Sequence, residues 1–232
     1  MLKGYLAAHG ISGDMVAERY TPQGLTRWRE LVADIRRFAK GNHAAIIATI
    51  TGDANLHFFR ELKRQTVTAD EVPVMSLSIN EAELPALMRC DIAGHMVAWN
   101  YFHAFDRKEN RQFIAAWRRF TGRSKAVTND SMEATWIGFH LWAEAVEAAG
   151  TTETDKVKAA LGGRMIAAPS GFTVKMDART HHLYKPAMIG RITPDGAIVP
   201  IWVTEGLVPP DPWSRWLKSE PTDAPAATAR AA

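Results

Sequence analysis

The sequence contains a single cysteine, Cys90, in 232 residues. An intrachain disulfide is therefore impossible, and cysteine usage leaves the redox compartment open. Free cysteine packs as a small apolar side chain in most folded proteins, so we expect Cys90 to be buried.

Long apolar segments are also missing. No stretch approaches the roughly 18 consecutive apolar residues of a membrane-spanning helix. The N-terminal segment MLKGYLAAHGISGD also lacks the apolar core of a secretory signal. As written, the sequence predicts a protein that neither spans a membrane nor is exported, and hence a cytoplasmic one.

The motifs of common catalytic machinery are absent. The sequence has no G-x-S-x-G, H-E-x-x-H, G-x-G-x-x-G or phosphate-binding loop. His181 and His182 are adjacent, so on a strand they point to opposite faces, and no Cys, His or acid cluster accompanies them at metal-ligand spacing. We therefore expect no enzyme activity, no metal and no cofactor.

Charge of either sign is not concentrated in the sequence. The 28 Lys and Arg residues are interspersed with 25 Asp and Glu residues, and the formal net charge is only +3. No basic face interleaved with aromatics stands out, which argues against nucleic-acid binding. Hydrophobic residues make up 47% of the chain, enough for the core of one large domain or two small ones.

The most informative stretch that is present runs from Ala44 to Leu62. Ala44–Ile50 is a short run without charge or alternation, which predicts a strand buried on both faces, as in a parallel sheet. The turn Thr51–Asn55 supplies a flexible glycine and two capping residues where a helix begins. Because ligands of open α/β sheets bind beyond the carboxyl ends of the strands, we expect this turn to form one wall of a binding site.

Strands and helices alternate along the first hundred residues. The spacing of apolar side chains predicts a helix over 25–38, and further strands are expected at 72–76 and 94–100. Ser78–Glu83 forms a second strand-to-helix turn, and Met15–Tyr20 is expected to add one more strand. This alternation predicts a mostly parallel α/β sheet flanked by helices.

The pattern then changes to helices without intervening strands. Helices are expected at 109–120, 130–149 and 152–161. The second opens with Asp130 and Glu133 at the spacing of a capping box. The apolar faces of these helices need a sheet from elsewhere in the molecule.

The last part of the chain predicts strands and a tail. Strands are expected at 171–176, 187–192 and 197–203, the last two joined by a hairpin turn at Pro194–Gly196. We expect these strands to complete the edge of the first sheet. Residues 217–232, rich in Ala, Pro and Thr, are expected to be a disordered tail.

Six short motifs together resemble the substrate-binding proteins of urea ABC transporters. In chain order they are TGDAN (51–55), PVMSLSINEAE (73–83), GHMVAWNYF (94–102), VTNDSMEATWIG (127–138), HHL (181–183) and PDPW, which ends at Trp213. Their order and spacing also match, and the similarity runs from about Leu2 to Trp216. These are type I periplasmic binding proteins, related to a short-chain amide sensor and to branched-chain amino-acid binding proteins.

The resemblance implies two α/β lobes that are joined by three crossing strands and close on a small solute. Residues 1–98 and 165–216 would form most of the second lobe, and 103–161 would supply helices that pack on the sheet of the first. Family members carry a signal peptide and that first-lobe sheet ahead of the point where this sequence starts. The resemblance is thus to their C-terminal portion, it implies a periplasmic location, and the two-lobe architecture is expected to be incomplete.

The missing sheet would leave large side chains uncovered on the helices. Trp117, Trp136, Phe139 and Trp142 lie on the apolar faces in question. A large uncovered apolar patch favours aggregation or a partner, so we expect the isolated chain to be poorly soluble or self-associated.

Candidate site residues follow from the positions of the motifs. The resemblance implies that the two strand-to-helix turns contact the solute through Gly52, Asp53 and Ser78, with Thr51, Ser76 and Tyr101 as further candidates. The Asp53 carboxylate could accept N–H groups of an amide or urea. The Ser78 hydroxyl could do the same or donate to a carbonyl.

Several of these residues also have a structural interpretation. Asp53 and Ser78 could cap the helices that follow them. Tyr101 could be an aromatic residue that packs at the hinge. Glu81 and Glu83 are expected to be first-turn acids that favour the helix dipole.

These inferences predict solute binding for ABC-type uptake of urea or a short-chain amide, with an ABC permease as the partner if the protein is exported. Two alternatives share the fold, namely a cytoplasmic amide-sensing regulator and a truncated remnant that binds nothing. An enzyme that acts on an amide is an alternative of a different class.

Overall fold

The computed structural model describes residues 1–11 and 13–217. These residues form two compact units: unit 1 contains residues 1–20 and the described residues from Asp211 on, and unit 2 contains Thr21–Pro210. Apart from Leu217, the tail expected at 217–232 lies outside the described residues.

Unit 1 contains α1 (Leu2–Ala8) and the short 3-10 helix η1 (Gly13–Met15). Trp216 packs against α1, with its ring centroid 5.5 Å from that of Tyr5. The prediction of a strand at Met15–Tyr20 is wrong, because residues 16–20 form no regular element. A strand needs a neighbour for its N–H and C=O groups, and no described strand pairs with this segment.

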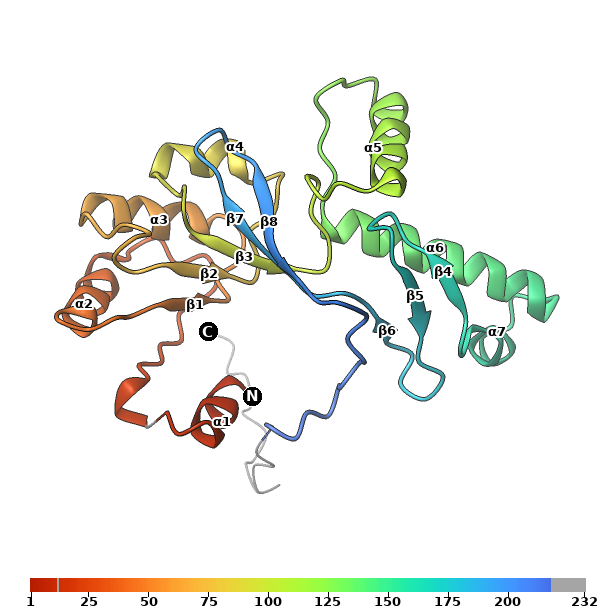
Figure 1. The fold of residues 1–232 in the computed structure, drawn as a ribbon, viewed down its shortest axis with the longest axis horizontal. Coiled ribbons are helices and arrows are strands. Elements are labelled where there is room, and N and C mark those ends of the chain that lie inside the picture. Colours follow the sequence, from red (N-terminus) through yellow and green to blue (C-terminus); the bar gives the residue numbers. More distant parts are fainter. Residues whose placement is uncertain (12, 218–232) are drawn as a thin grey trace, which may run out of the picture. The chain divides into compact units, whose positions relative to one another are not determined.

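The centre of unit 2 is a five-stranded sheet in the order β1-β2-β3-β7-β8 (Figure 1). Its strands are β1 (Ile46–Ala48), β2 (Val74–Ser76), β3 (Met96–Trp99), β7 (Met188–Ile192) and β8 (Ile198–Val203). The first three strands are parallel, whereas β7 pairs antiparallel with β3 and with β8. The predicted α/β fold is confirmed, with a mixed sheet.

Helices precede and follow the first parallel strands and pack on the sheet. They are α2 (Arg29–Ala39), α3 (Ala54–Arg64), α4 (Leu84–Leu87) and the 3-10 helix η2 (Met88–Cys90). Phe58, Phe59 and Leu62 of α3 are buried in the same cluster as Val74 and Val97 of the sheet. Cys90 is buried and unpaired, as predicted.

The burial of β1 differs from the prediction that both of its faces are covered. Ala48 is buried, but Ile47 is 49% exposed. The reason is that β1 is an edge strand, and the buried side chains alternate with exposed ones along it.

A second, three-stranded antiparallel sheet contains β4 (Met165–Ala167), β5 (Thr173–Met176) and β6 (Leu183–Tyr184). The prediction that 171–176 completes the edge of the first sheet was therefore wrong, and of the three late strands only β7 and β8 do so. The physical reason is that β5 belongs to a hydrophobic core separate from that of the five-stranded sheet. Val174 and Met176 of β5 pack with Ile137 and Leu141 of the helix α6 (Asp130–Ala149).

The other predicted helices are confirmed as α5 (Lys108–Thr121) and α7 (Thr154–Leu161). The capping box predicted for α6 is not formed. Asn129 is the N-cap, and its side chain accepts a hydrogen bond from the Met132 N–H at 3.0 Å. Asp130 and Glu133 are buried in the first turn and bind other groups.

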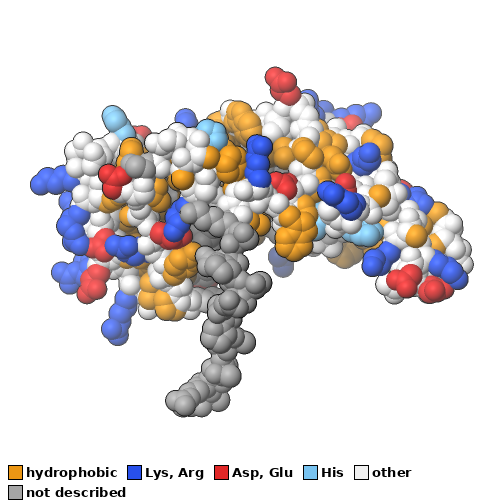
Figure 2. Space-filling model, turned by 90° about the horizontal axis from the view of Figure 1, so that it is seen from below, with side chains coloured by type: hydrophobic (Ala, Val, Ile, Leu, Met, Phe, Trp, Pro, Cys, Tyr) orange, Lys and Arg blue, Asp and Glu red, His pale blue; other side chains and the backbone are white. Residues whose placement is uncertain are grey.

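Large aromatic side chains are exposed on α5 and α6. Phe120 is 83% exposed, Phe139 60% and Trp142 48%. Trp117 and Trp136 are half-buried. Trp117 stacks on Phe120, and Trp136 packs on the core shared with β5, with its ring centroid 4.1 Å from that of His140. Figure 2 shows one face of the molecule, on which exposed hydrophobic side chains lie among charged ones. In the described part of the chain, none of the helices has the length and apolar character to cross a membrane.

We expect that replacing Phe139 and Trp142 together by Ser lowers self-association of the chain, because both aromatics lie on the exposed side of α6. Size-exclusion chromatography with light scattering measures the mass distribution. Trp202→Ser is the matched control, since Trp202 is 51% exposed but lies on β8, and it should leave the distribution unchanged. An unmodified chain that is a monodisperse monomer and binds no apolar dye contradicts the prediction.

Candidate functional site

The two strand-to-helix turns lie side by side at the carboxyl edge of the sheet. β1 and β2 are adjacent and parallel, with Ala48 opposite Ser76, so both chains leave the sheet in the same direction. The Ser78 hydroxyl donates to the carbonyl of Ile50, and Asn55 Nδ2 donates to Ser78 Oγ at 3.2 Å. The two turns are thus adjacent, whereas ligand binding by them stays a prediction.

Thr51, Gly52 and Asp53 form the exposed rim of the first turn. Gly52 has φ +62°, in the left-handed region that favours glycine. Asp53 is the N-cap residue of α3, but its side chain makes no capping hydrogen bond. The Asp53 carboxylate is thus exposed at the start of the helix.

The two serines of the second turn have different roles. Ser76 is buried, and its Oγ accepts hydrogen bonds from the backbone N–H groups of Ser78 and Ile79 at 3.2 and 3.1 Å. It therefore shapes the turn from within. Ser78 is half-buried and joins the two turns through Ile50 and Asn55.

Tyr101 follows β3 and is completely buried. Its hydroxyl lies 2.5 Å from Asn110 Oδ1 and 2.5 Å from Thr128 Oγ1, and its ring packs edge-on against Phe113. Burial raises the pKa of the Tyr101 hydroxyl. These contacts match its structural interpretation as an aromatic residue that packs where the chain leaves the sheet.

Three acceptors that the sequence did not single out as site residues are buried at these turns. Asn55 Oδ1, Glu81 Oε2 and Glu83 Oε2 accept no hydrogen bond from any described residue. Glu81 and Glu83 were expected to be acids of a first helical turn, but α4 begins only at Leu84, so this prediction is wrong. Their position within a predicted turn was the available signal, but their burial depends on chain segments far away in sequence.

The pKa values of the two acids of the second turn are raised. Burial raises the pKa of Glu81 to about 7, although the His103 backbone N–H donates to Glu81 Oε1 at 2.7 Å and stabilises the charged form. Burial also raises the pKa of Glu83, and the negative charge of Asp53 adds to that effect. Two carboxyl groups with raised pKa values therefore lie at this edge of the sheet.

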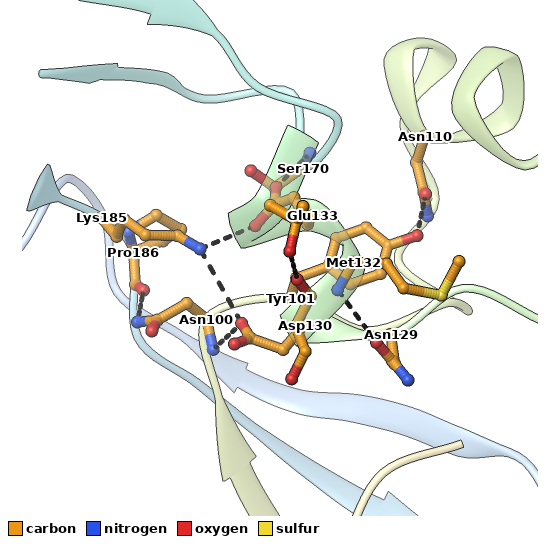
Figure 3. A network of polar contacts seen from close by, with 12 residues as sticks. Asn100, Tyr101, Asn110, Asn129, Asp130, Met132, Glu133, Ser170, Lys185 and Pro186 are labelled. Carbon is orange, nitrogen blue, oxygen red and sulfur yellow. Dashed lines mark hydrogen bonds and ion pairs between the residues drawn. The ribbon is translucent and has the colours of Figure 1, made fainter. Parts of the chain in front are cut away.

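A buried polar network lies where the chain leaves the five-stranded sheet (Figure 3). Lys185 Nζ is 2.8 Å from Glu133 Oε2 and 3.8 Å from Asp130 Oδ1. Asp130 also accepts from the Asn100 N–H, and Glu133 accepts from the Ser170 N–H at 2.8 Å. The network thus ties the first turn of α6 to three distant segments of unit 2.

Three segments of the chain lie where the five-stranded sheet adjoins the part that contains α5–α7 and β4–β6. The first segment follows β3, the second joins β6 to β7, and the third follows β8. The second and third segments pair with each other, since Val208 N donates to Lys185 O at 2.8 Å and Thr204 N donates to Ala187 O at 3.0 Å. Asn100 on the first segment donates to Pro186 O at 2.5 Å.

Comparison with known proteins identifies the family. The model of the family described as "Periplasmic binding protein domain" matches residues 1–219. The chain belongs to this family, and its fold is the α/β fold of type I periplasmic binding proteins.

Solved structures share the fold at low sequence identity. A solute binding protein of an ABC transporter from Rhodopseudomonas palustris, in complex with p-hydroxybenzoic acid, has a TM-score of 0.76 and 22% identity over 89% of this chain and 56% of that chain. An amino acid ABC transporter substrate-binding protein from Pseudomonas fluorescens has a TM-score of 0.74 and 16% identity over 90% of this chain and 55% of that chain. The chain therefore spans about half the length of these solved proteins.

One curated relative has the name of an enzyme. Limonene hydroxylase from Geobacillus stearothermophilus is 29% identical over 121 residues, which is 52% of this chain and 22% of that protein. The similarity is confined to a small part of that relative, whereas the family match covers nearly the whole chain. Periplasmic binding proteins are a class of solute-binding proteins and not of enzymes.

We expect Glu81→Gln to remove a pH dependence of stability. With a folded-state pKa of about 7 against an ordinary value of 4.5, native Glu81 holds its proton more tightly than the unfolded chain does, so the free energy of unfolding falls as pH rises through this window. The difference in the free energy of unfolding between the unmodified chain and Glu81→Gln should change by roughly 2–4 kcal/mol between pH 4.5 and pH 8. Denaturation with guanidinium chloride at both pH values measures it.

The matched control for this experiment is the exposed residue Glu205, as Glu205→Gln. The control should follow the pH dependence of the unmodified chain. Parallel stability profiles for the unmodified chain and Glu81→Gln would mean that Glu81 is not held in its protonated form.

Lys185→Met should destabilise the fold by about 3–5 kcal/mol, because the carboxylates of Glu133 and Asp130 then lose the cation beside them in a buried site. Adding Glu133→Gln should restore part of that loss. Chemical denaturation measures both variants against Lys158→Met, an exposed lysine on α7. A loss equal to that of the control would show that the network contributes little.

Proposed function

We propose that this chain is the solute-binding part of an ABC-type uptake system for urea or short-chain amides. The observation that carries the proposal is the junction of the two turns, where Asn55 and Ser78 join the carboxyl ends of two parallel strands in a member of the periplasmic binding protein family. Ligands of open α/β sheets bind at such an edge. The motifs around 51–55 and 73–83 favour urea or an amide as the solute.

In this proposal the solute is captured between two lobes, and the closed form is presented to a membrane permease outside the cytoplasm. The five-stranded sheet with its helices would supply one wall. The helices α5–α7 would belong to the opposite lobe, together with β4–β6, because β5 shares a core with α6. This division gives residues 165–184 to the helical part and departs in that respect from the boundaries expected from sequence.

The proposed contacts from this wall are Gly52 and Asp53 on the first turn and Ser78 on the second, with Thr51 beside them. Asp53 supports the proposal because its carboxylate is exposed and makes no cap bond. Ser76 and Tyr101 are buried, and their oxygens are held by other groups of the chain. We therefore propose a supporting role for these two residues.

Asp53→Ala should weaken the binding of urea or acetamide by roughly 1–3 kcal/mol, since N–H groups of the solute lose an acceptor. Calorimetric titration of the complete polypeptide that the gene encodes measures it. Asp70→Ala, an exposed aspartate ahead of β2, is the control and should leave the affinity unchanged. Ammonia is measured in the same samples, and sustained release would assign an enzyme instead of a binding protein.

A further inference from the structure

A surface hollow of about 390 Å³ lies between α2 and the end of α3, two helices that Figure 1 shows side by side. It is lined by Arg29, Ala33, Arg36, Arg64, Gln65 and Thr66. The first strand-to-helix turn lies at the start of α3, and the 11 residues of that helix span roughly 16 Å. The hollow is therefore separate from the proposed solute site.

Two arginines of α2 border the hollow from the same side of that helix. Arg29 and Arg36 are seven residues apart, which is close to two helical turns, and the small side chain of Ala33 lies between them. In the described part of the chain, neither guanidinium group forms an ion pair or a side-chain hydrogen bond. Their N–H groups are thus available to a bound molecule.

The third arginine is held in position by contacts at the end of α3. Arg64 Nε and Nη2 donate to the two carboxylate oxygens of Glu61 at 2.8 and 2.6 Å. Gln65 Nε2 donates to Glu61 Oε1 at 2.6 Å and to the carbonyl of Arg29 at 2.8 Å, so it joins the end of α3 to the start of α2. The frame of the hollow is therefore fixed by hydrogen bonds within the chain.

Positive charge is in excess at this place. The hydrogen bond from Arg64 lowers the pKa of Glu61, and the charge of Arg29 adds to that effect. Both oxygens of Glu61 are already bound, and no carboxylate of a described residue lines the hollow. Three guanidinium groups thus share one neighbouring carboxylate, which leaves an excess of two positive charges.

We propose that Arg29, Arg36 and Arg64 form an arginine pocket that binds a phosphate group. A guanidinium group presents N–H donors in a planar fork that matches the oxygens of phosphate. A phosphate monoester carries a charge of about −1.5 to −2 at pH 7, which balances the excess charge of the pocket. The pocket is a second site, and it goes beyond the proposed binding of urea or an amide.

Titration with inorganic phosphate at constant ionic strength tests the pocket in the complete polypeptide. We expect saturable changes in the NMR signals of the Arg29 and Arg36 side-chain Nε–H groups. Arg36→Gln should weaken phosphate about fivefold, the upper end for one ion pair at an exposed site. Replacing Arg29 and Arg36 together by Gln should abolish saturable binding.

Arg37→Gln is the matched control, because it removes the same charge from the same helix. Arg37 is ion-paired with Asp34 and does not line the hollow. The control should bind phosphate as the unmodified chain does. Thermal unfolding without phosphate checks that each variant folds.

The phosphate group can belong to a soluble compound or to a lipid headgroup, and co-sedimentation with vesicles distinguishes the two sources. Binding to vesicles of phosphatidylcholine and phosphatidic acid, but not of phosphatidylcholine alone, would assign a headgroup if Arg36→Gln reduces it and Arg37→Gln does not. Saturable phosphate binding without vesicle binding would assign a soluble compound. Both results support the arginine pocket.

Two results overturn the arginine pocket. One is a phosphate response that does not saturate or that sodium chloride reproduces at equal ionic strength, because diffuse screening explains it. The other is an equal loss of phosphate binding in Arg36→Gln and Arg37→Gln. Either result leaves the proposed function in place, because titration with urea or acetamide tests that separately.

Discussion

The parallel pairing of β1, β2 and β3 is the constraint on which the candidate site depends. Parallel neighbours leave a sheet at the same edge, so the segments after Ile50, Ser76 and Trp99 are brought together, although about fifty residues separate the first from the last. Helices α3 and α4 carry the chain back after the first two strands. Each helix returns the chain to the opposite edge of the sheet, so the next parallel strand again ends at the same edge as the strand before it.

Hydrogen bonds connect the second turn to other segments of unit 2. Trp99 Nε1 donates to Ile79 O at 2.6 Å, His103 N donates to Glu81 Oε1, and the turn also contacts Asn129 at the start of α6. These contacts join the second turn to the chain that follows β3 and to the start of α6. The buried ion pair of Lys185 and Glu133 joins α6 to the segment between β6 and β7.

Sequence reasoning was most successful where local pattern and tertiary environment agree. The apolar spacing in α2, α5 and α6 specifies helices regardless of what they pack on, so these were predicted to within a few residues. It failed at Met15–Tyr20 and at β5, because a strand is defined by its partner and the pattern does not name one. Among the site residues, Ser76 and Tyr101 have the polar groups of a binding residue but use them internally.

The sequence by itself determined the α/β class, the family and the two polar turns, because these depend on the residues within short stretches of chain. The tertiary structure alone decided which oxygens at those turns are left to accept a hydrogen bond. Burial and hydrogen-bond partners are set by segments distant in sequence. Asn55 is one of the two capping residues expected in the turn Thr51–Asn55. In the structure its side-chain NH₂ instead donates to Ser78, twenty-three residues later, and Ser78 donates to Ile50.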